Sequence, residues 1–113
     1  MLPDELIDEA ARLFALLSDP NRLRLVRALH QHGELPVGDI ADCGETSLAN
    51  ASQHLLRLAA AGLVTRRRDG KHVLYRIADP RIEQLCATVC ESAVSRMPAA
   101  AGSARLVGAR EGL

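Results

Sequence analysis

The hydrophobic period of this chain changes once, near Gly62, and that change limits the folds open to the sequence. Before it, apolar residues recur every three or four positions, which is typical of amphipathic helices. After it, residues 63–68 and 71–77 read as two strands around Asp69-Gly70. An Asp-Gly pair suits a type I′ turn, because both central residues of that turn need positive φ. The sequence therefore predicts several helices and one β-hairpin.

Capping signals divide the helical part. Asp19-Pro20 and Asp79-Pro80 each place a capping Asp before a proline that suits the first helical turn, and Ser47 is a good N-cap. Helices are predicted over residues 4–17, 20–32, 36–43, 47–62 and 80–97. The order predicts a mainly α winged helix-turn-helix, α-α-α-α-β-β-α, as one domain over residues 1–97. Residues 98–113 carry little apolar periodicity and are expected to form a flexible tail.

Composition constrains the core and the location. The 113 residues include no Trp, one Tyr and one Phe, so the core must be aliphatic. Such a small core often gains burial by dimerising. No apolar run reaches the roughly 18 residues of a membrane span, and no signal-peptide pattern opens the chain. We therefore expect a cytoplasmic protein without a membrane partner.

The predicted helix over residues 47–62 has two unlike faces. A helical wheel gathers Leu48, Ala51, Leu55, Leu56, Leu58 and Ala59 on one arc, which suits a core. The opposite face carries Asn50, Gln53, His54 and Arg57. Amides can pair with adenine through a donor and an acceptor, and Arg fits the guanine edge. With Ser47, Ala49 and Ser52 near the start of the helix, this face predicts contact with the edges of DNA bases, although an ordinary solvated face remains the alternative.

Charge is unevenly distributed although the net charge is +0. Residues 1–45 hold nine acidic residues against four arginines, whereas residues 57–81 hold seven basic residues against two acidic ones. The hairpin carries Arg66, Arg67, Arg68 and Lys71. Such a block can bind the phosphate backbone, although charge runs usually form solvated surface loops. Its place directly after a recognition-type helix favours double-stranded DNA as the partner.

Two other classes of function stay open. A winged helix can be a protein-protein interaction module in which the hairpin cations pair with acidic side chains. An enzyme is disfavoured because the chain offers no nucleophile–base pair, phosphate loop or paired carboxylates. Ser52 and His54 lie on different sides of the wheel and do not form a catalytic dyad.

These segments resemble the ArsR/SmtB family of bacterial metal-sensing and redox-sensing repressors. The resemblance runs from about Leu13 to Val94 and rests on four stretches: LFALLSDPNRLRLVRAL, PVGDIAD, SQHLLRLAAAGLVTRRRDGKHVLYRI and ADPRIEQL. It implies a homodimer formed through the first and last helices. It also implies repression by operator binding that an inducer releases, or a regulator that depends on a partner protein and has no inducer site of its own.

The family's known sensor sites are not matched. Pro36 and Gly38 stand where the arsenic-type members carry cysteines, and Arg27 stands at the thiol-redox position. Asp79 matches the zinc-type site of the last helix, but its other positions hold Arg81, Ser92 and Ser95. Arg57 and Ala61 replace the cysteines of a further variant.

Three cysteines remain, Cys43, Cys86 and Cys90. Cys86 and Cys90 are four residues apart, so their Cβ atoms would lie roughly 5–6 Å apart on one helix face. Two thiolates at that spacing could bind a transition-metal ion or metalloid as inducer, with Cys43 or a partner-chain group completing the site. Packing is the competing interpretation, because Cys86 falls within an apolar stripe and free cysteine is often buried. No cofactor is certain from the sequence.

Overall fold

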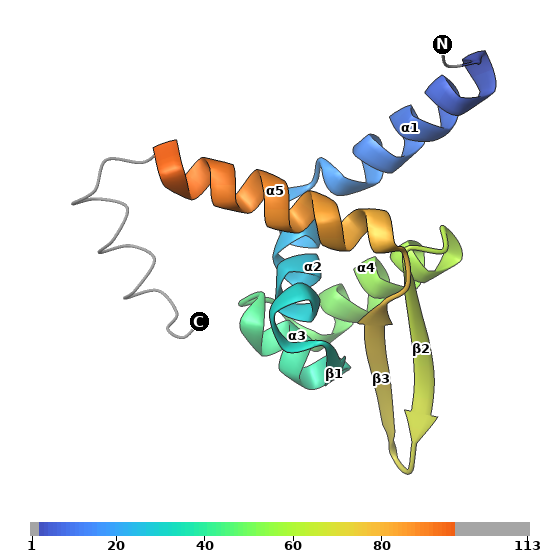
Figure 1. The fold of residues 1–113 in the computed structure, drawn as a ribbon. Helices are drawn as coiled ribbons and strands as arrows, with labels where there is room; N and C mark the ends of the chain where they lie inside the picture. Colours follow the sequence, from blue (N-terminus) through green and yellow to red (C-terminus); the bar gives the residue numbers. More distant parts are fainter. Residues whose placement is uncertain (1–2, 97–113) are drawn as a thin grey trace.

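The fold is that of a computed structural model, which describes residues 3–96, with side chains as far as Val89. In chain order the elements are α1 (Asp4–Leu17), α2 (Pro20–His32), β1 (Glu34–Pro36), α3 (Val37–Cys43), α4 (Leu48–Ala60), β2 (Val64–Asp69), β3 (His72–Ile77) and α5 (Pro80–Arg96). The predicted mainly α fold with a β-hairpin is confirmed (Figure 1). The tail expected over residues 98–113 lies outside the described residues.

The capping signals act as the sequence predicted. The Asp19 carboxylate accepts a hydrogen bond from the backbone N–H of Asn21, with Pro20 in the first turn of α2. Asp79 likewise accepts from the backbone N–H of Arg81 at the start of α5, at 2.9 Å. Gly70 has a φ of 63°, which suits the tight turn between β2 and β3.

A third strand, β1, was absent from the sequence prediction. It pairs with β3, which gives an antiparallel sheet in the order β1-β3-β2, and Leu35 lies opposite Tyr75. The strand has only three residues and ends in Pro36, which cannot donate to a ladder and is tolerated here because β1 is an edge strand. A segment this short carries too few residues to show a period of two.

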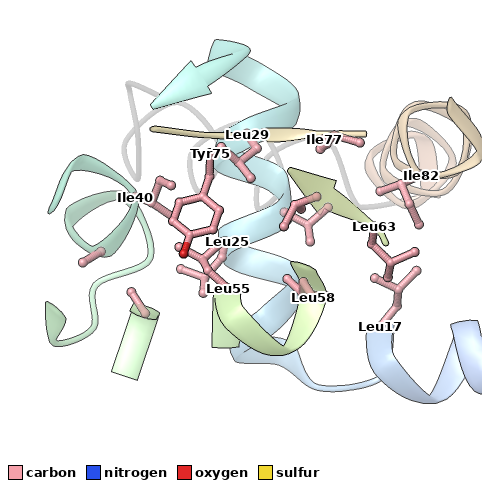
Figure 2. Close-up of a cluster of buried hydrophobic side chains, with 14 residues drawn as sticks. Leu17, Leu25, Leu29, Ile40, Leu55, Leu58, Leu63, Tyr75, Ile77 and Ile82 are labelled. Atoms are coloured by element: carbon pink, nitrogen blue, oxygen red, sulfur yellow. The ribbon is translucent and has the colours of Figure 1, made fainter. Parts of the chain in front are cut away.

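An aliphatic core joins α2, α3, α4, the sheet and the start of α5. Leu25, Leu29, Ile40, Leu55 and Leu58 are fully buried, and Tyr75 is the aromatic member of the cluster (Figure 2). Truncating a leucine in such a cluster costs about 2–5 kcal/mol of stability, from lost burial and the cavity left behind. The core therefore fixes α4 and the base of the hairpin on one rigid body.

The helices at the two ends of the chain leave apolar surface uncovered. α1 extends away from the helical body (Figure 1). Leu6 and Phe14 of α1, Leu23 of α2 and Val89 of α5 are exposed in the single chain. Phe14, Leu23, Leu85 and Val89 border an apolar pocket of about 530 Å³ between α1, α2 and α5. No helix among residues 3–96 is long and apolar enough to cross a membrane.

Candidate nucleic-acid interface

Helix α4 begins with the predicted N-cap. The Ser47 hydroxyl accepts a hydrogen bond from the backbone N–H of Asn50, at 3.0 Å. The helix is held to the core by Ala51, Leu55 and Leu58, which are completely buried. Because these three residues follow one stripe, the opposite face is fixed outward. Gln53 and Arg57 are both exposed there, as is the small Ala49 of the first turn, while Ser52 is half-buried.

Two of the leucines that the wheel placed in the core are not buried. Leu48 is 55% exposed and Leu56 is 48% exposed, so the prediction for these residues was wrong. The buried stripe of α4 is narrower than the apolar arc of the sequence.

The outer face of α4 is less free than the sequence suggested. Nδ2 of Asn50 donates to the Thr46 hydroxyl at 2.7 Å, and Asn50 is half-buried. Nδ1 of His54 accepts from Nε of Arg22 in α2 at 3.3 Å. For Gln53 and Arg57, no hydrogen bond or ion pair joins the side chain to any described residue. The face thus combines two restrained side chains with two that are available to a ligand.

The wing, which we define as residues 64–77, projects from the body as a two-stranded ribbon (Figure 1). Arg66, Arg67, Arg68 and Lys71 are all exposed, as predicted for a phosphate-binding hairpin. They are not equivalent, however. Arg66 lies opposite Tyr75 and Arg68 lies opposite Val73, whereas Arg67 lies opposite Leu74. Because side chains alternate along a strand, Arg66 and Arg68 share one sheet face and Arg67 lies on the other.

On its face of the sheet, Arg67 has an acidic partner. Its Nε and Nη2 donate to the two carboxylate oxygens of Glu34 in β1, each at 2.9 Å. This bidentate ion pair with Arg67 lowers the pKa of Glu34, and the nearby charge of Arg76 lowers it further. The same hydrogen bond raises the pKa of Arg67. One wing arginine is therefore neutralised within the chain, while Arg66, Arg68 and Lys71 make no ion pair with another described residue.

Sequence reasoning missed two residues of this surface, Arg22 and Glu34. Arg22 belongs to the Ser18–Arg22 stretch that marks the start of α2, but nothing local shows that its side chain reaches α4. Glu34 is the first residue of β1, the strand that the sequence did not reveal. An acidic residue two positions after the end of α2, in a chain with a basic hairpin, was the available signal.

Two of the three cysteines, Cys43 and Cys86, have described side chains. Cys43 is exposed at the end of α3, and Cys86 is half-buried in α5, where it packs against the core cluster and borders the apolar pocket. The side chain of Cys90 lies outside the described residues. Among the described side chains, no three His, Cys, Asp or Glu gather closely enough to hold a metal ion. The predicted pair therefore stays a prediction, and the described residues alone supply no complete ligand set.

The fold and this surface define a winged helix-turn-helix protein. Residues 17–67 match the family model of a helix-turn-helix domain. The chain is 37% identical to the homodimeric winged helix-turn-helix DNA-binding domain of Mb0332 from Mycobacterium bovis, a possible ArsR-family transcriptional regulator. That match covers 80% of this chain and 82% of the other, with a TM-score of 0.71. The antimony-specific transcriptional repressor AntR is 30% identical, with a TM-score of 0.74 over 85% of this chain and 89% of its own.

Similar curated proteins include the cadmium resistance transcriptional regulatory protein CadC homolog of Staphylococcus aureus. It is 39% identical over 77 residues, which is 68% of this chain and 64% of that protein. The first cadmium-resistance relatives are matched over only 60–64% of their own length. Because of these sequence and structural similarities, the chain is assigned to the ArsR/SmtB family.

Proposed function

We propose that this protein is a sequence-specific DNA-binding transcriptional repressor that acts in the cytoplasm on double-stranded operator DNA. The observation that carries the proposal is the pairing of an outward polar face on α4 with a basic wing beside it. In this proposal α4 lies in the major groove, where Asn50, Gln53, His54 and Arg57 meet base edges. Ser47, Ala49 and Ser52 lie near the helix start, where backbone N–H groups can meet a phosphate.

The wing supplies the sequence-independent part of the affinity. Arg66, Arg68 and Lys71 are exposed cations that the described residues do not neutralise, which suits them to phosphate contacts. Arg67 contributes less, because Glu34 already holds its guanidinium. Base edges are thus read by the helix, while the wing adds attraction to any duplex.

Selection of binding sites from random DNA, followed by gel shifts over a salt series, tests this function. We expect an imperfect palindrome with half-sites about one helical turn apart, since a two-fold dimer presents two copies of α4. A discrete complex should also form on the region upstream of the protein's own gene. The proposal fails if no discrete complex appears on either DNA at moderate salt.

The competing function is a protein-protein interaction module. The exposed cations would then pair with acidic side chains of a partner protein. Competition separates the two: operator DNA should displace a protein bound to this surface if the surface is the DNA site. If a partner protein is captured and neither salt nor DNA weakens that binding, the interaction module is favoured instead.

We further propose that the protein is a homodimer formed through α1 and α5, with a second copy covering their exposed apolar surface. Phe14 is 60% exposed and Val89 is 54% exposed, and both border the apolar pocket. Exposed apolar surface of this extent is typical of an association site. The homodimeric state of a solved relative supports dimerisation.

The dimer is tested by sedimentation of the full chain. Phe14→Glu should shift the protein towards monomer, because it places a charge in the apolar surface. Glu5→Gln, also on α1, serves as a control that should leave the dimer intact. A Phe14→Glu protein that remains dimeric at low micromolar concentration would exclude α1 from the interface.

We propose a metal ion or metalloid as the inducer. Relatives are named for cadmium resistance and for antimony specificity. Cys86 and Cys90 are the residues of this chain that would hold a soft ion. Their thiolates would coordinate the ion, and the ion would add positive charge at α5. The position of Cys86 against the core accounts for it equally well as a packing residue.

A serine double variant separates sensing from packing. If the pair senses an ion, Cys86→Ser with Cys90→Ser should bind operator as the native protein does but should no longer release it when ions are added to reduced protein. The Cys43→Ser variant shows whether that exposed thiol takes part. If the double variant responds to every ion that releases the native protein, the pair is structural.

A further inference from the structure

Arg22 connects three helices through one side chain. Its side chain is only 12% exposed. Nη1 donates to the carbonyl of Leu16 in α1 at 2.7 Å, and Nη2 lies 3.6 Å from the carboxylate of Asp19. Nε donates to Nδ1 of His54 in α4 at 3.3 Å. Every nitrogen of the guanidinium therefore has a partner, and the group is held in one position.

This arrangement constrains where His54 carries its proton. Arginine does not lose its proton in proteins, so its Nε is always a donor. Nδ1 of His54 can accept that hydrogen bond only when it carries no hydrogen. A neutral imidazole with a bare Nδ1 carries its proton on Nε2.

We propose that Arg22 is a positioning residue that fixes the tautomer of His54, so that Nε2–H is presented as a hydrogen-bond donor to an acceptor on DNA. The inference rests on the proposed DNA-binding function. It assigns His54 the role of hydrogen-bond donor, rather than acceptor, at the DNA interface. Nε2 lies at the end of the ring farther from the backbone. No described residue accepts a hydrogen bond from it.

The ligand chemistry that follows is specific. A fixed donor suits N7 of a purine, O6 of guanine or O4 of thymine, or alternatively a phosphate oxygen, and it disfavours the N4 amino group of cytosine. Asn and Gln amides can serve donors and acceptors alike. His54 would therefore present a donor that is fixed before DNA arrives, whereas no described residue fixes the amide of Gln53.

The tautomer can be measured directly in the free full-length protein. Long-range ¹H–¹⁵N correlation spectra distinguish the two neutral tautomers of His54 and the imidazolium. Of the two neutral tautomers, we expect the Nε2–H form alone. A dominant Nδ1–H tautomer would overturn the proposal whether or not the protein binds DNA.

Arg22→Lys tests the positioning role. The single nitrogen of lysine cannot serve Leu16, Asp19 and His54 together, so the Nε2–H preference should weaken to a mixture of forms. Circular dichroism and thermal melting check that the variant is folded. A folded Arg22→Lys protein with an unchanged His54 spectrum would show that Arg22 does not set the tautomer.

Two substitutions at His54 form a matched pair that leaves Arg22 in place. Gln places its amide nitrogen near the position of Nε2, whereas Asn places polar atoms only near Nδ1. We expect His54→Gln to keep operator affinity within about threefold and His54→Asn to lose about fivefold or more, as for one lost hydrogen bond. Equal affinities for the two variants, or tighter binding by Asn, would overturn the proposal.

The operator itself identifies the acceptor. Each base pair of the selected operator is changed in turn, and methylphosphonate linkages are introduced separately. A position whose change weakens the native protein but not His54→Asn marks the partner of Nε2–H, as base or as phosphate. If no position behaves this way, the donor has no partner on DNA and the proposal fails, while binding through Gln53 and the wing would still support the proposed function.

Discussion

Helix α4 and the wing are neighbouring elements that differ in how firmly their polar side chains are held. On α4, Asn50 and His54 are held by Thr46 and Arg22, and the helix is pinned by a fully buried stripe. On the wing, Arg66, Arg68 and Lys71 are exposed cations on a projecting ribbon. Restraint suits the directional hydrogen bonds of base recognition, whereas mobile cations suffice for a phosphate backbone that offers charge at every step. Specificity and attraction are thus expected to be separable by mutation.

Gln53→Ala gives the largest expected effect and tests the helix side of this contrast. Losing a bidentate base contact costs about 1–3 kcal/mol, so operator affinity should fall about 5- to 150-fold. Affinity for random DNA should not change, because Gln53 carries no charge. Parallel gel shifts on operator and random duplexes measure both. Leu56→Ala, at an exposed site off the polar face, is the control; an equal loss on both duplexes would contradict the role given to Gln53.

The wing variant Arg68→Ala with Lys71→Ala should act on all DNA alike. Two lost phosphate contacts should weaken operator and random duplexes together by about tenfold at moderate salt. The slope of log affinity against log salt should fall by roughly two. Arg67→Ala is the matched control, because Glu34 already neutralises that arginine. If Arg67→Ala weakens binding as much as Arg68→Ala does, the Glu34 ion pair does not persist on DNA.

Helix α4 and the wing also show which features of the fold and site could be predicted from the sequence. Ser47, Asp19-Pro20 and Asp69-Gly70 predicted the helix starts and the turn correctly, because capping and turn chemistry depend on residues close in the chain. The outward polar face of α4 followed from the helical period.

What the sequence could not reveal depends on distant pairs. His54 is held by Arg22 from 32 positions away, and Arg67 is held by Glu34 from 33 positions away. Neither pair has a local pattern, and β1, which positions Glu34, is too short to show a period. The exposure of Leu48 was missed for a related reason: a wheel shows which residues share a face, but not how far the neighbouring core extends along the helix.

Glu34→Gln has the smallest expected effect. It removes the ion pair that restrains Arg67 of the wing, as Thr46 and Arg22 restrain Asn50 and His54 of α4. Removing the carboxylate frees Arg67 for a phosphate. Affinity for random DNA should therefore rise a few-fold at low salt, and the salt slope should steepen by about one. Gel shifts over a salt series measure both. Glu5→Gln changes the net charge equally but lies on α1, so it controls for a general effect of charge.

The same variant has a pH signature in the absence of DNA. Arg67 lowers the pKa of Glu34 in the folded chain, so the ionised carboxylate stabilises the fold at pH values above its unfolded pKa of about 4.3. That contribution is lost as the pH falls through the lower, folded pKa. Glu34→Gln lacks it, so its melting temperature should fall less than that of the native protein on acidification. The effect should be small, because the pair is exposed and water screens it. Identical acid dependence, together with unchanged DNA binding, would mean that Arg67 is as free as its neighbours and that the wing is uniform.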